Sequence, residues 1–128
     1  MASQLKVDTI TGVTTAGSIS VTGEGNSTTT NLQQSLVKVW AKFNGSSFGE
    51  LDSFNVSSFT DSGTGNYTVN INNDFSNANH ASIEGSGAYH AINDAGNAAG
   101  TLNIGCFNSS QSAADESRVA VHSCGDLA

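Results

Sequence analysis

The chain has 128 residues, which is enough for one domain with a modest core of its own. Its net charge is −7 with only four lysines and arginines, so it lacks the cationic surface that binding to nucleic acid or to an anionic membrane requires. Charged residues make up only 12%, and Gly, Ser, Thr and Asn beside Val, Ile and Phe are typical of strands and tight turns.

Residues 1–30 hold two short strand candidates, LKVDTI and SISVTG, and too little apolar mass for a separate core. We expect them to form an extended N-terminal arm that docks on another surface. The side chains expected to dock are the larger apolar ones of the two candidates: Leu5, Val7, Ile10, Ile19 and Val21. The first residues lack the features of a signal peptide, and no apolar run approaches the ~20 residues of a membrane span. The sequence therefore predicts folding in a cytoplasm, without membrane insertion.

Residues 31–128 carry the remaining strand signals and are expected to form one head domain. Its first segment, TTTNLQQSL, is ambiguous: Thr30 and Gln33 fit a capping box for a short helical turn, but the segment could equally lead straight into the next strand. LVKVWAKF then alternates, with Val37, Val39, Ala41 and Phe43 on one face and Lys38, Trp40 and Lys42 on the other. This pattern predicts a strand over 36–43, followed by a turn at NGSS.

The stretch FNVSSFTDSGTGNYTVNI predicts a β-hairpin. Phe54 and Val56 would share a face of its first strand, and DSGTG supplies the positive φ angles that a short hairpin loop needs. Adjacent serines at 57 and 58 disturb the alternation, which favours a bulge.

Four later segments also have strand character: HASIEG joined to AYHAI, then TLNIGCF and SRVAVHSC. Short strands at this spacing, without long helices, predict an all-β fold, an antiparallel β-sandwich of jelly-roll-like type. Cys106 and Cys124 are expected to stay free. If the last two strands paired as a hairpin, the two thiols would lie ~17 Å apart, too far for a disulfide.

No motif for a nucleotide, a metal or a nucleophile is present, so no cofactor and no enzymatic activity are expected. His80, His90 and His122 could contribute to a metal site or act as a base. They are more typical of surface or interface residues on a β scaffold, because their spacing fixes no convergence of ligands. The segment NINNDFSNAN offers oxygens for Ca²⁺, but Asn and Asp are also ordinary loop residues.

The outward face of the strand at 36–43 is the clearest candidate contact surface. Trp40, between Lys38 and Lys42, could stack on a sugar or could pack against the arm or a neighbouring subunit. His80 and His90 are two further residues that we expect to contact another molecule at the surface or at an interface.

VKVWAKFNG, followed by LDSFNVSSFTDSGTGNYTVNINNDFSNANHA, resembles a module of tail-fibre-like and other virion structural proteins of tailed bacteriophages, most of all marine and cyanobacterial phages. The likeness is specific over residues 38–80 and weaker over 84–116. RVAVHSCGDLA is similar to the module's closing strand, and LKVDTIT with SISVTG looks like the piece that often precedes it. Ser76 stands in place of the usual Pro, and His80 in place of the usual aromatic residue.

The resemblance implies a β-sandwich head, a homotrimer and a place on the virion, assembled in the host cytoplasm. The leading hypothesis is a short fibre-like appendage that contacts other virion proteins through its arm and the host surface, including host glycans, through its head. A capsid decoration protein is the alternative, and a free lectin-like module is a further one. A fourth hypothesis, a small hydrolase, would lose turnover on His90→Ala.

Overall fold

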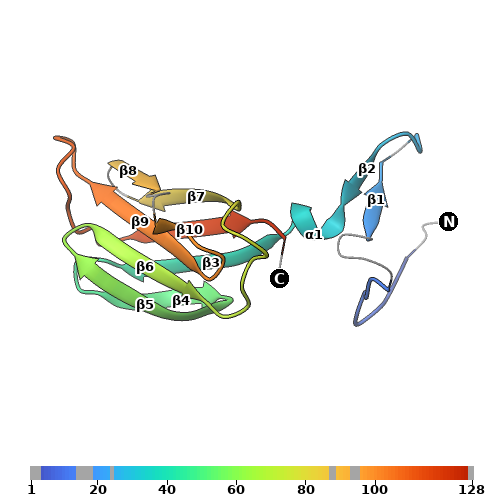
Figure 1. Ribbon diagram of the computed structural model, residues 1–128, viewed down its shortest axis with the longest axis horizontal. Helices are drawn as coiled ribbons and strands as arrows, with labels where there is room; N and C mark the ends of the chain where they lie inside the picture. The colour runs from blue at the N-terminus through green and yellow to red at the C-terminus, as the bar shows by residue number, and fades with distance from the viewer. Residues whose placement is uncertain (1–3, 14–18, 24, 87–88, 93–95, 127–128) are drawn as a thin grey trace.

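The computed structural model describes residues 4–13, 19–23, 25–86, 89–92 and 96–126 (Figure 1). Strands dominate it and the one named helix has four residues. The described part of the chain holds no helix with the length and apolar character that crossing a membrane requires. The elements in chain order are β1 (Ser20–Thr22), β2 (Thr29–Asn31), α1 (Leu32–Ser35), β3 (Val37–Asn44), β4 (Gly49–Phe54), β5 (Val56–Gly63), β6 (Asn66–Ile71), β7 (Ala81–Ser86), β8 (Tyr89–Ile92), β9 (Thr101–Phe107) and β10 (Val119–Cys124).

Two four-stranded antiparallel sheets form the body of the molecule, with strand orders β4-β3-β10-β7 and β5-β6-β9-β8. The hairpins β3–β4, β5–β6 and β8–β9 each stay within one sheet, and the chain changes sheets after β4, β6, β7 and β9. The sheets lie face to face in Figure 1. The predicted all-β antiparallel sandwich is therefore confirmed.

The core lies between the sheets and follows the period of two that strands impose. Val39, Ala41 and Phe43 of β3 are buried, as the sequence predicted, and Leu102 and Ile104 of β9 face them from the other sheet. The prediction fails at both residues that begin β3. Val37 is 42% exposed, because it stands at the end of the strand outside the core, while Lys38 is only 8% exposed.

The predicted hairpin is present as β5–β6, with its bulge between Val56 and Ser58 and positive φ angles at Gly63 and Gly65. Its first strand begins later than expected, however. Phe54 ends β4, a strand that the sequence analysis did not expect, and β5 starts only at Val56. Between them Asn55 has a φ of 61°, which turns the chain from one sheet to the other. Phe54 and Val56 therefore lie in different sheets.

The last two strands also differ from expectation. TLNIGCF becomes β9 and pairs with β6 and β8, whereas β10 lies in the other sheet between β3 and β7. The hairpin assumed for these two strands is absent. Cys106 is buried, Cys124 is half-buried, and both thiols are free.

The loop before β10 is fixed to the far end of the β5–β6 hairpin by one carboxylate. Asp115 accepts hydrogen bonds from the backbone N–H of Gly65 (2.7 Å) and from the Tyr67 hydroxyl (2.8 Å). These two donors hold the pKa of Asp115 below its ordinary value, because both stabilise its charged form. Burial, followed by the bond to Asp115, raises the pKa of Tyr67.

The N-terminal part lies to one side of the two sheets (Figure 1). Within the predicted strand SISVTG, Ser20–Thr22 form β1, which pairs with β2, and a helical turn follows. The residue that caps this turn is Asn31, whose side chain accepts from the N–H of Gln34 at 3.1 Å, so the capping box predicted from Thr30 and Gln33 is wrong by one position. LKVDTI forms no strand, because no described strand lies beside it to complete a ladder.

Candidate functional site

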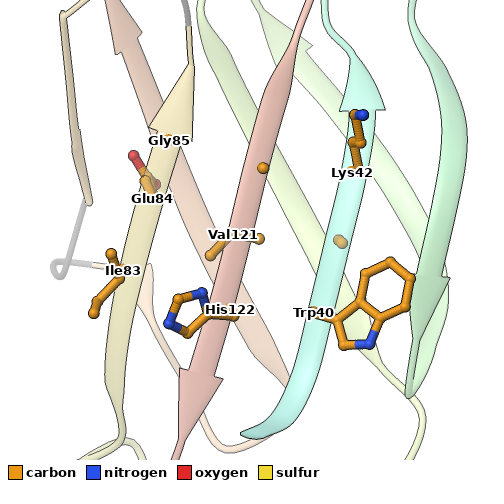
Figure 2. Close-up of a pocket in the computed structure, with 9 residues that line it drawn as sticks. Trp40, Lys42, Ile83, Glu84, Gly85, Val121 and His122 are labelled. Atoms are coloured by element: carbon orange, nitrogen blue, oxygen red, sulfur yellow. The ribbon is translucent and has the colours of Figure 1, made fainter.

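Four side chains form a continuous row across the outer face of the sheet β4-β3-β10-β7. The register pairs Phe54 with Trp40, Trp40 with His122, and His122 with Ile83. Phe54 is 55% exposed, Trp40 37% and Ile83 63%, and His122 is exposed as well. Figure 2 shows Ile83, His122 and Trp40 side by side on β7, β10 and β3. We call Phe54, Trp40, His122 and Ile83 the exposed row.

A shallow groove of about 410 Å³ runs beside the exposed row over β7, β10 and β3. Its lining is mostly apolar, with Ala120 and Gly85 next to His122 and Ile83. Lys42 borders the groove (Figure 2). It pairs across the ladder with Asp52 of β4, so opposite charges lie beside the row. The surface therefore offers an apolar contact area with few charged groups at its margin.

Glu84 of β7 is unusual because it turns a carboxylate away from solvent. Both of its oxygens are shielded, and neither accepts a hydrogen bond from any residue that the structure describes. Burial raises its pKa to about 7. Burial also raises the pKa of the Cys106 thiol to about 12, with the charge of Glu84 as the second cause. Glu84 on β7 is thus a carboxylate whose ionised form is destabilised by burial, without a hydrogen bond from the described residues to compensate.

Replacing this acid should make the protein less sensitive to alkaline pH. The pKa of Glu84 rises from an ordinary value of 4.5 to about 7 on folding, so the folded state holds its proton more tightly. Stability that is present below about pH 4.5 is consequently lost as the pH rises to about 7. We expect Glu84→Gln to raise the melting temperature at about pH 8 and to leave it nearly unchanged at about pH 4.5, in thermal unfolding followed by circular dichroism. An equal shift at both pH values would contradict this origin.

The structure separates the residues that the sequence singled out on the head. Trp40 and Lys42 lie at the exposed row and its groove, as outward residues of β3. Lys38 is buried instead. His80 is half-buried, stacks on Phe75 with ring centroids 4.4 Å apart, and its Nδ1 lies within hydrogen-bond distance of Ser82 and Ser123. His90 lies in β8, where its backbone pairs with Cys106, and its side chain falls outside the described residues.

Three members of the exposed row were missing from the predicted surface. Phe54 was expected to share a strand face with Val56, and Ile83 and His122 were not linked to Trp40. Alternation within each segment could have placed each of them on one side of its strand. It could not have shown that β4 and β10 flank β3, or that β7 follows β10 in the same sheet.

The predicted docking residues of the N-terminal part are largely open to solvent. Leu5 is 81% exposed, Val7, Ile10 and Val21 are each more than half exposed, and Ile19 is half-buried. Val13, which was not among them, is 91% exposed. The described residues of this part therefore present an apolar surface with no core beneath it.

The described residues contain no group of three or more His, Cys, Asp or Glu side chains that could hold a metal ion. In the segment considered for Ca²⁺, Asn73 donates its backbone N–H to Asn55 Oδ1 at 2.8 Å, and Asn77 Oδ1 accepts from the N–H of Asn79 at 2.7 Å. These oxygens and amides hold the loop itself.

Comparison with protein-family models, with curated proteins and with solved structures found no match for this chain.

Proposed function

We propose that this chain is a non-enzymatic structural protein of a tailed-phage virion. In this proposal it is a short fibre-like appendage, a homotrimer, that is held by its N-terminal part and displays the β-sandwich toward the host surface. The motif resemblance over residues 38–80 supports the virion assignment. The sandwich supports a display role, since its rigid sheets close their own core.

The observation that carries the proposal is the uneven distribution of apolar surface. The sandwich buries a core of large apolar residues between its sheets and leaves others, such as those of the exposed row, open to solvent, whereas Leu5, Val7, Ile10 and Val13 are all exposed and lie outside that core. Four exposed apolar side chains on one short segment are characteristic of a surface that another chain covers. We infer that the N-terminal part is the assembly element and the sandwich is the displayed element.

Electron microscopy of particles labelled with an antibody against this protein tests the assignment. Label confined to the tail or to one vertex is the expected result. Label at regular positions over the head would replace the fibre by the alternative, a capsid decoration protein that stabilises the mature shell by mass action. Particles without label would overturn the virion proposal and favour the free lectin-like module.

A variant of the N-terminal part then tests how the protein is held. We expect Leu5→Ser/Val7→Ser/Ile10→Ser to fold normally but to be lost from purified particles, because these side chains contribute nothing to the core. Leu51→Ser removes an apolar side chain of comparable exposure from β4 and serves as the matched control. Equal amounts of both variants on particles would contradict the proposed role of the N-terminal part.

A further inference from the structure

We propose that the exposed row receives the N-terminal segment, residues 4–13, of a second copy of this chain. This inference rests on the proposed role of that segment as an assembly element and names the surface on which it docks. In the single chain both surfaces are apolar and open to solvent. Covering one with the other would remove both from water at once, and this burial of apolar surface is the main driving force for most protein association.

The two surfaces match in length. The exposed row crosses four hydrogen-bonded strands, which spans ~14 Å at the usual ~4.8 Å between neighbours. An extended segment from Leu5 to Thr9 spans ~13 Å at ~3.3 Å per residue, and its alternating side chains put Leu5, Val7 and Thr9 on one face. The segment can therefore lie across the strands with Leu5 and Val7 on the row. The shallow groove beside the row can take one of them.

Charge favours this segment over a second sandwich as the occupant. Nine of the eleven acidic residues follow residue 30, whereas the segment 4–13 carries one acid, Asp8, and one base, Lys6. Two sandwiches brought face to face would repel each other, but the neutral segment meets no such repulsion.

The position of the N-terminal segment in the fold favours docking on the exposed row of a neighbouring copy over docking on its own. Figure 1 places the N-terminal segment beyond α1, on the side of that turn away from the two sheets. Extending from one copy, the segment reaches outward rather than back over its own sandwich. A contact between two different surfaces is heterologous, and such contacts generate a closed ring when the rotation between copies closes. This geometry is compatible with the proposed trimer.

Disulfide trapping between two variants tests the contact in the full-length chain. In a Cys124→Ser background, which leaves only the buried Cys106, the variants Val7→Cys and Ile83→Cys are mixed and mildly oxidised. We expect a mixed disulfide dimer. The matched control mixes Val7→Cys with Leu51→Cys, which places an exposed thiol on β4 outside the row. This pair should give little mixed dimer.

Sedimentation of the untrapped protein supplies the second readout. Trp40→Ser removes the central aromatic side chain of the row, and we expect it to weaken self-association about tenfold or more, as loss of a buried aromatic anchor does. Leu51→Ser should leave self-association unchanged.

The inference is overturned if the mixed dimer does not exceed the control, or if Trp40→Ser associates like the wild type. It is also overturned if a Val7→Cys/Ile83→Cys double variant cross-links only within one chain. If the trapping experiment shows no contact but the antibody still labels virions, this inference is refuted and the proposed function stands.

Discussion

Gly65→Ala is expected to lower the free energy of unfolding by about 3 kcal/mol or more, since it combines a disfavoured backbone conformation with overpacking. The φ of Gly65 is +66°, and a β-carbon there would lie 2.7 Å from the backbone nitrogen of Ala114 and against the carbonyl oxygen of Cys106. Neither backbone atom can move freely, because the N–H of Ala114 donates to that same carbonyl at 3.0 Å. The loss would be a large part of a typical domain's 5–15 kcal/mol.

Gly63→Ala is the matched control, because it lies in the same turn. Its φ is +119° and a β-carbon there would meet no atom within 4 Å, so the whole cost, about 1–3 kcal/mol, comes from the backbone conformation. Urea unfolding of both variants measures the difference. If Gly65→Ala costs no more than Gly63→Ala, the close approach of β9 and the loop before β10 has little energetic weight.

Asn55→Ala is expected to cost about 2–4 kcal/mol, because Asn55 both adopts a positive φ and bonds two other segments. Its amide donates to the carbonyls of Lys38 and Asn73, each at 3.0 Å, and its Oδ1 accepts from the N–H of Asn73 at 2.8 Å. Alanine would lose these hydrogen bonds and would also disfavour the turn. Chemical unfolding measured by tryptophan fluorescence gives the free energy.

Asn55→Gly separates the two contributions. Glycine accepts the φ of 61° without strain but makes no side-chain hydrogen bond, so its cost should fall between those of the wild type and Asn55→Ala. If glycine proved as costly as alanine, the hydrogen bonds alone would account for the effect. A glycine variant as stable as the wild type would mean that only the backbone conformation matters.

The same corner shows why part of the fold could be predicted and part could not. Apolar residues at every second position identified β3, β6 and β9, because each has one face in the core. It failed at Asn55, where FNVSSF reads as one strand although a single positive φ divides it. Asn tolerates that conformation, but Asn70 and Asn103 lie within strands of this same chain, so the residue type alone does not mark a corner.

The exposed row could be predicted from the sequence only in part, and the reason differs from that at Asn55. The outward position of Trp40 and Lys42 follows from the pattern of their own strand. The row itself depends on which strands are neighbours and in what register, and Phe54, His122 and Ile83 come from segments far apart in the sequence. Lateral order is set by the packing of the whole sandwich, which no local pattern encodes.

The central position of β10 has a consequence for the order of events during synthesis. The ribosome makes this strand after all the other strands of the sandwich, yet it joins β3 to β7 in the middle of its sheet. Until it emerges, β3 and β7 each keep an unpaired edge, and such long-range pairing folds slowly. His122 of β10 is also the link between Trp40 and Ile83. A nascent chain therefore has no complete exposed row, and the surface appears only when the sandwich has closed.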